Sequence, residues 1–457
     1  MRKKELNKKY GASHISALFT KRKNTYVTFS IIIILCTAGV LATTPEHAFS
    51  VTFGPVTNLS NDSDNSGDTF VVKSGNKVYV VWANEVNDIF FKRSTDNGAT
   101  FGPPKNLSND PGFNGKPRMA ASGNSVYVVW EGEGLSGQDV FLVRSADGGN
   151  NFGSPINLSN HGATENPKIA ASGNNVYVVW ADASFGNFEV AFKRSTNNGA
   201  SFGSIKNLSN NPPESLSPKV KASGDNVYVL WNDDNDPNGQ DVFYKRSTNN
   251  GASFGSTKDL SGDDSGGAGQ IAISGKNVYV TWTGGTDIFF KRSTNEGASF
   301  GSTKNLSNNP GLSEVSRIGA SGNNVYVIWM DDTGIPGGNC TTTAENCDVF
   351  FRASNNKGAS FSGTINLSNN PEASWGSNVL ASGNSVYVLW DDATPGNFDI
   401  FFRASHNKGA SFDDAINVSE NTGDSGPPDM SRKGNSAYVV WKDVTPGNGE
   451  ILFKKGQ

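Results

Sequence analysis

The chain has 457 residues and a formal charge of −4, and it contains 52 Gly, 28 Phe and 9 Trp. The first 48 residues hold eight basic and two acidic side chains, so residues 49–457 carry a formal charge of −10. A body this acidic lacks the basic face that nucleic-acid binding requires. Abundant glycine and aromatic residues indicate short aromatic strands between many turns, which is typical of an all-β protein.

Residues 1–48 are predicted to direct the chain out of the cytoplasm. Basic residues within 2–23 precede an uncharged, mostly apolar stretch at 26–42. This order is typical of a signal peptide or of an uncleaved signal-anchor helix. Both alternatives place residues 49–457, as a single domain, in the extracellular space or at the cell surface. The second alternative adds a membrane attachment.

The remainder of the chain repeats one pattern eight times. Its marker is a run of the type Val-Tyr-Val-x-Trp, which follows a tight turn and precedes an acidic loop, a second apolar run and a further turn. Successive runs are 47 to 61 residues apart, and the longest interval contains an inserted loop. The runs end at Trp82, Trp130, Trp180, Trp231, Trp282, Trp329, Trp390 and Trp441.

The third copy shows the strands that we expect in every repeat, at 168–172, 175–180, 189–194 and 201–209 from innermost to outermost. The run 175–180 does not alternate apolar with polar residues, so both of its faces should be buried. Four-stranded antiparallel sheets that cover one another's faces form a β-propeller, here with eight blades.

The two ends of the repeat region predict how this propeller closes. The chain finishes on a third strand at 451–455, and the body begins with an outermost strand at 51–60. Pairing of these two segments would complete the eighth blade and remove an open sheet edge.

A turn between the third and fourth strands recurs seven times, as in Ser94-Thr-Asp-Asn-Gly-Ala-Thr-Phe101. It resembles the Asp box, the bacterial-neuraminidase repeat of sialidase-like propellers. The third residue can bind the N–H groups of the turn as an acid or as an amide, and the glycine permits a positive φ. Because the third residue is Asp in some copies and Asn in others, its role is expected to be structural. The third residues are Asp96, Asp147, Asn197, Asn249, Asn295, Asn356 and Asn407.

The resemblance implies catalytic residues that this chain does not supply. Sialidases of that family use a Tyr nucleophile with a Glu, an acid/base Asp and three Arg that bind a carboxylate. Outside the eight repeat positions, residues 49–457 contain one Tyr, Tyr244, which is expected inside a third strand. The family's Phe/Tyr-Arg-Ile-Pro signature is absent, and the nearest segment is Ser316-Arg-Ile-Gly. These departures disfavour a retaining sialidase mechanism.

Three arginines are nevertheless predicted near the starts of innermost strands, at the rim where active sites of the family lie. Arg118, Arg317 and Arg432 could bind the carboxylate of a substrate. Alternatively they represent variation at a generally basic position, because Lys168 and Lys219 are their expected counterparts.

Acidic residues recur two positions after the repeat Trp, in loops expected to share that rim. They could act in a glycosidase, bind Ca²⁺ as in 232–236, or cap strand ends as solvated turn residues, which the pattern favours. No fixed-spacing metal loop is present. Trp375, predicted in a rim loop, could stack on a sugar. The acidic residues are Asp182, Asp233, Asp331, Asp392 and Asp443.

Two further features fit an exported protein. Cys340 and Cys347 share the inserted loop, where an oxidising compartment would favour a disulfide. Asn-x-Ser sequons recur at the ends of the outermost strands, either as glycosylation sites or because the Asn side chain terminates the strand. The sequon residues are Asn58, Asn106, Asn157, Asn207, Asn305, Asn366 and Asn417.

The sequence thus predicts a sialidase-like propeller that binds a glycan or a surface protein at its rim, without a cofactor. The alternative is an exo-acting, exo-α-sialidase-like glycoside hydrolase with a non-standard active site.

Overall fold

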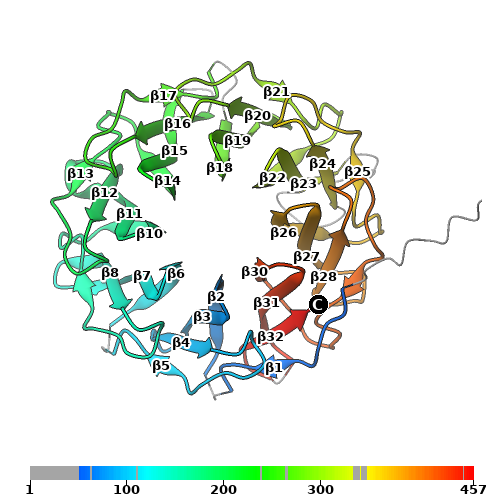
Figure 1. Cartoon of the computed structure of the whole chain (residues 1–457), viewed down its shortest axis with the longest axis horizontal. Coiled ribbons are helices and arrows are strands. Elements are labelled where there is room, and N and C mark those ends of the chain that lie inside the picture. The colour runs from blue at the N-terminus through cyan, green and yellow to red at the C-terminus, as the bar shows by residue number, and fades with distance from the viewer. Residues whose placement is uncertain are drawn as a thin grey trace, which may run out of the picture. The chain divides into compact units, whose positions relative to one another are not determined.

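The computed structural model describes residues 51–457 apart from 62–63, 110–111, 237–238, 263–265, 333–339, 341–346 and 446. The predicted signal or anchor segment lies outside the described residues. Eight four-stranded antiparallel sheets are arranged as blades around a central channel (Figure 1). The predicted eight-bladed propeller is therefore confirmed. No helix among the described residues is long and apolar enough to cross a membrane.

The four strands of each blade run outward from the channel. The innermost strands are β2 (Ser66–Ser74), β6 (Asn114–Ser122), β10 (Thr164–Ser172), β14 (Ser215–Ser223), β18 (Gly266–Ser274), β22 (Ser313–Ser321), β26 (Ser374–Ser382) and β30 (Asp429–Lys433). The second strands are β3 (Lys77–Asn84), β7 (Ser125–Gly134), β11 (Asn175–Asp182), β15 (Asn226–Asp236), β19 (Asn277–Gly284), β23 (Asn324–Asp331), β27 (Ser385–Asp392) and β31 (Ser436–Asp443).

The outer half of each blade is shorter. The third strands are β4 (Ile89–Ser94), β8 (Gly137–Ser145), β12 (Glu189–Ser195), β16 (Gly239–Ser247), β20 (Asp287–Ser293), β24 (Asp348–Ser354), β28 (Asp399–Ser405) and β32 (Glu450–Gly456). The outermost strands are β5 (Lys105–Asn106), β9 (Ile156–Asn157), β13 (Lys206–Asn207), β17 (Lys258–Asp259), β21 (Lys304–Asn305), β25 (Ile365–Asn366), β29 (Ile416–Asn417) and β1 (Thr57–Asn58). A short 3₁₀ helix, η1 (Ala183–Phe185), follows β11.

The outermost strands are shorter than the sequence predicted, because their last residue turns the chain. In β13 the side-chain oxygen of Asn207 accepts the N–H of Asn210 at 2.9 Å, and Asn210 has a φ of 50°. The same bond recurs in all eight blades, with Asp259 replacing Asn in one of them. The expected strand-terminating role of the sequon residues is confirmed, and their glycosylation stays a prediction.

The Asp-box turns have the predicted geometry with either residue type. Asp96 Oδ1 accepts the N–H of Thr100 at 2.9 Å, and Asn197 Oδ1 accepts the N–H of Ser201 at 3.0 Å. Hydrogen bonds from Ser94 and then Thr100 lower the pKa of Asp96. Gly98 has a φ of 82°, and a Cβ there would lie 2.9 Å from the Phe453 ring. The turns are therefore structural elements of the blades.

The hydrophobic core is divided among the interfaces between neighbouring blades. The second strands are buried on both faces, as predicted, and their Trp residues have exposed fractions of 0–1%. Between the first two blades, Val81 and Phe91 pack with Met119, Val128 and Trp130. Equivalent clusters fill the other seven interfaces. Each blade thus buries its apolar residues against both of its neighbours.

The ring closes by pairing the first described segment with the last strand. Thr57 of β1 lies opposite Phe453 of β32, and Thr52 and Gln457 exchange two backbone hydrogen bonds of 2.9 and 3.0 Å. Leu59, fully buried, contributes to the cluster between the last and first blades. The predicted closure of the eighth blade is confirmed.

Leu59→Ala is expected to lower the free energy of unfolding by about 2–5 kcal/mol, because it removes a buried side chain and leaves a cavity at the closure. Chemical denaturation followed by tryptophan fluorescence measures the change. Val56→Ala is the matched control, since Val56 lies in the same segment and is 51% exposed. Equal effects of the two substitutions would contradict a stabilising role for Leu59 in the closure.

Candidate functional site

Every innermost strand places one residue at the same level of the channel. This residue stands twelve positions before the repeat Trp and pairs with the residue that immediately precedes that Trp. All eight line one cavity of ≈ 880 Å³ at the end of the channel where the innermost strands begin. This channel ring consists of Phe70, Arg118, Lys168, Lys219, Gln270, Arg317, Asn378 and Asp429.

The channel ring lies directly after an irregularity of the innermost strands. In seven blades the pairing register with the second strand shifts just before the ring residue. Such bulges redirect side chains and are frequent beside active sites. Val315, two positions before Arg317, has a φ of 51°, and the equivalent residues of five other blades have φ values of 45–56°. The left-handed conformation therefore belongs to the repeated bulge.

Positive charge is concentrated on one part of the ring. Arg118, Lys168 and Lys219 come from three consecutive blades, Arg317 comes from the second blade beyond them, and Lys221 follows two residues after Lys219. We call these five residues the cationic arc. Within the described residues, none of them lies within 4.0 Å of a carboxylate oxygen. Their charges are therefore not neutralised by direct ion pairs.

The observed hydrogen bonds of the cationic arc go to backbone carbonyls. Arg118 donates to the carbonyl of Pro117 at 2.7 Å, and Arg317 donates to that of Ser316 at 3.1 Å. Lys168 donates to two neighbouring carbonyls at 3.3 and 3.4 Å. The guanidinium of Arg118 also lies 5.7 Å from the centre of the Phe70 ring.

Burial and mutual repulsion favour loss of protons from the arc. Burial, followed by the charges of Arg118 and Lys219, lowers the pKa of Lys168 to about 6. Burial, followed by the charges of Arg317 and Arg118, lowers the pKa of Lys219 to about 8. Lys221, two residues further along the same strand, is exposed. The arc therefore brings like charges close together, which is electrostatically unfavourable.

Across the ring from these cations, Asp429 has a structural role. Its carboxylate accepts the N–H of Val71 at 2.9 Å and the side-chain amide of Asn378 at 3.1 Å. Burial raises the pKa of Asp429 to about 6, against these hydrogen bonds and the attraction of Arg118. Asp429 therefore links three successive blades at the level of the ring.

Trp375 forms an aromatic wall of the cavity. The sequence placed it in a rim loop, whereas the structure places it in β26, opposite Asp391 of β27. Its side chain is 40% exposed, lines the cavity and lies 5.6 Å from the Phe398 ring at an interplanar angle of 46°. Pro427 and Pro428 of the next blade extend this wall. The predicted exposed indole is thus present at the site.

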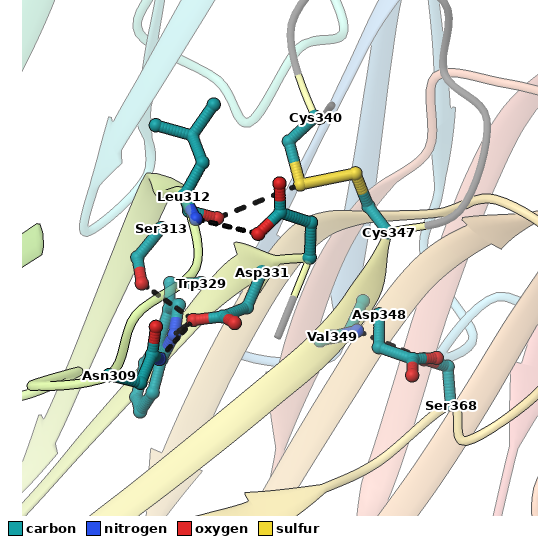
Figure 2. Close-up of a disulfide and its surroundings, with 11 residues drawn as sticks. Asn309, Leu312, Ser313, Trp329, Asp331, Cys340, Cys347, Asp348, Val349 and Ser368 are labelled. Carbon is teal, nitrogen blue, oxygen red and sulfur yellow. Dashed lines mark hydrogen bonds between the residues drawn. A yellow bond between two sulfur atoms is a disulfide. The ribbon is translucent and has the colours of Figure 1, made fainter. Parts of the chain in front are cut away.

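The repeated acidic residues are not on the rim, which corrects the sequence-based expectation. Asp331 is fully buried, and one of its oxygens accepts hydrogen bonds from Trp329 Nε1 at 2.8 Å, Ser313 Oγ at 2.5 Å and Asn309 Nδ2 at 2.7 Å (Figure 2). The carboxylates therefore connect the first and second strands inside the blades and are neither solvated nor available to a ligand. The same burial holds for Asp182, Asp233, Asp392 and Asp443.

Arg432 also lies away from the site. It pairs with Ala437, donates to the carbonyl of Gly434 and lies 5.1 Å from the centre of the Tyr387 ring. Its position is three residues beyond the channel ring, so it is not a counterpart of Arg118 and Arg317. Tyr244, as expected, is buried within its blade.

The remaining predictions concern the inserted loop and metal binding. The Cys340–Cys347 disulfide is confirmed (Figure 2), and Cys340 lines the cavity. Within 232–236, Asp233 accepts hydrogen bonds from Ser215 and Asn211. The described residues contain no group of three or more His, Cys, Asp or Glu arranged to hold a metal ion. Calcium binding stays an untested prediction.

Comparison with known proteins supports the fold. No protein-family model and no functionally curated protein matches the sequence. Among solved structures, the chain is similar to an ulvan lyase of polysaccharide lyase family PL25, with a TM-score of 0.53, 12% identity and coverage of 87% of this chain and 95% of that chain. This similarity supports the propeller fold.

Two matches are weaker. The polysaccharide lyase Uly1 has a TM-score of 0.49 at 9% identity, over 85% of this chain and 89% of that chain. The NanB sialidase from Streptococcus pneumoniae has a TM-score of 0.41 at 10% identity, over 87% of this chain and 94% of that chain.

Lys168→Gln is expected to reduce the rise of stability with pH. The folded protein holds Lys168 at a pKa of about 6 against an ordinary value of 10.5. Between these values the unfolded chain binds more protons, so stability increases with pH in the parent protein. Urea denaturation at pH 6, 7, 8 and 9 measures the slope. An unchanged slope in the variant would contradict the lowered pKa.

Proposed function

We propose that the chain is an exported or cell-surface carbohydrate-binding propeller whose ligand occupies the channel cavity. The observation that carries the proposal is the composition of that cavity, in which the exposed Trp375 indole faces hydrogen-bonding side chains supplied by the channel ring. Sugars combine apolar ring faces with many hydroxyl groups, and such sites bind them through stacking and convergent polar contacts.

Two further observations support this proposal. One similar solved structure is named a polysaccharide lyase, so a propeller with this fold acts on a polysaccharide. The basic and apolar segment within residues 1–48 and the Cys340–Cys347 disulfide fit a protein that functions outside the cytoplasm.

The geometry favours binding over hydrolysis. Both oxygens of Asp429 accept hydrogen bonds from the protein, and the repeated carboxylates are buried in the blades. One feature favours the alternative, an exo-acting glycoside hydrolase. Glu314 lines the cavity, and burial followed by the charge of Asp332 raises its pKa, as a general acid requires.

Trp375→Ala is expected to weaken binding to a glycan selected on a glycan array by about tenfold, because the stacking surface is lost. Isothermal titration calorimetry measures the affinity. Phe185→Ala is the matched control, since Phe185 is an equally exposed aromatic residue at 40% that does not line the cavity. Equal loss in both variants, or no glycan bound on the array, would argue against the proposed site.

Glu314→Gln tests the hydrolase alternative. We expect the parent protein to release no fluorophore from a panel of fluorogenic α- and β-glycosides, including sialosides, because Asp429 is engaged in hydrogen bonds and the repeated carboxylates are buried. Turnover by the parent protein that the substitution abolishes would replace the binding function with a hydrolase. Circular dichroism confirms that the variant is folded.

A further inference from the structure

We infer that the ligand of the channel is a glycan segment with at least two negative charges, as carboxylate or sulfate groups, which the cationic arc binds together. This inference rests on the proposed function and specifies the class of carbohydrate. It depends on the position, number and unpaired state of the five arc residues.

The first argument comes from comparison of equivalent positions within the chain. The eight ring residues occupy the same register of nearly identical blades, yet the ring contains Phe70, Gln270 and Asn378 as well as cations. The blade therefore tolerates apolar, amide and charged side chains at this level. Because folding does not require a cation there, the clustering of cations is best explained by a ligand.

The second argument concerns the charges around the arc. Glu131, adjacent to Lys168, is paired with Lys116 at 3.2 Å and accepts the N–H of Asn166. The carboxylate of Asp429 accepts hydrogen bonds from Val71 and Asn378. Asp68, Glu314 and Asp391 line the cavity but, within the described residues, lie more than 4.0 Å from the charged nitrogens of the arc. The arc thus retains an excess of positive charge.

The spread of the arc over four blades favours a ligand with more than one anionic group. Several arginines can converge on a single carboxylate, but one guanidinium already supplies two parallel N–H bonds to it. Here four blades each contribute one basic residue to the ring. Lys221, a fifth basic residue, lies two positions after Lys219 in the same strand. One carboxylate would leave most of these charges unpaired inside the cavity. Two or more anionic groups on successive sugars would neutralise them.

Binding of such a ligand has a characteristic proton linkage. Near pH 7.5, Lys168 is mostly neutral in the empty cavity because its pKa is about 6. An anionic group beside Lys168 favours the ammonium form, so the protein takes up protons when the ligand binds. Acidification protonates both Lys168 and Asp429, and both changes make the ring more positive. Affinity for an anion therefore increases from pH 8 to pH 5.5.

The test is calorimetric titration of the purified protein at pH 7.5 with four probes. These are tetragalacturonate, its carboxyl-reduced neutral counterpart, monogalacturonate and a chondroitin sulfate tetrasaccharide. We expect both anionic tetrasaccharides to bind, the monouronate to bind at least tenfold more weakly, and the neutral probe not to bind. Titrations in two buffers of different ionisation enthalpy give the number of protons taken up.

Variants distinguish a charge effect from a general loss of structure. Lys168→Gln is expected to weaken binding about tenfold or more and to reduce proton uptake to the smaller contribution of Lys219, whose pKa is about 8. Lys168→Arg should restore affinity without restoring the full proton uptake, because arginine remains charged. Lys276→Gln is the control, since this lysine belongs to a turn outside the cavity and its side chain is 80% exposed; its affinity should equal that of the parent protein.

The outcomes separate this inference from the proposed function. Equal binding of neutral and anionic tetrasaccharides, lost in Trp375→Ala, would overturn the inference and uphold carbohydrate binding. Anion binding that depends on Lys168 but not on Trp375 would overturn carbohydrate recognition and uphold the charged site. Equal affinity for the monouronate, or no binding of either anionic probe at 10 mM (on the order of the weakest measurable affinities), would overturn the inference.

Discussion

The structure depends on one constraint, which is that the second strand of each blade must be covered on both faces. Its residues are apolar without alternation, and the Trp at its end is buried in every blade. A single four-stranded sheet cannot cover both of its own faces, so each blade requires a neighbour on either side. Closing the ring satisfies this requirement for all eight blades, and the pairing of β1 with β32 completes the last one.

The same constraint separates structural polar residues from functional ones. In four blades a Trp indole N–H donates to an Asp two residues later, as in Trp180 with Asp182 at 2.8 Å. These carboxylates satisfy a polar atom that burial of the Trp would otherwise leave unpaired. Apart from Asp429, which links three blades, the residues of the channel ring have no such structural role, because they project inward from the edge of the blade. Variation there leaves the blade interfaces intact, which explains why its residue types diverge.

This difference also determines how much the sequence could predict. The strands, the blade number and the closure followed from a repeat that packing enforces in every copy. Assignment of the site failed where register had to be known: Arg432 was grouped with Arg118, although Asp429 is the residue that stands twelve positions before its Trp. In the blade of Arg118, a bulge just before the ring residue shifts the pairing of β6 with β7. No local residue pattern predicts this bulge. Counting back from each Trp would have confirmed Lys168 and Lys219 as counterparts and would have put Asp429 in the place of Arg432.

Likewise, the acidic residues that recur after each Trp were expected at the rim because acidic residues are mostly solvated. Only the structure reveals that they are buried and hydrogen-bonded.

Net charge is misleading in the same way. The body carries −10, which argues against binding of extended polyanions to its outer surface, yet the cavity concentrates five cations. An acidic exterior with a cationic channel repels a polyanion everywhere except where a segment of it fits the cavity. For the proposed ligand, repulsion by the surface and attraction by the ring would together favour short, exposed anionic segments, so that specificity would follow from the placement of charge, not from its total.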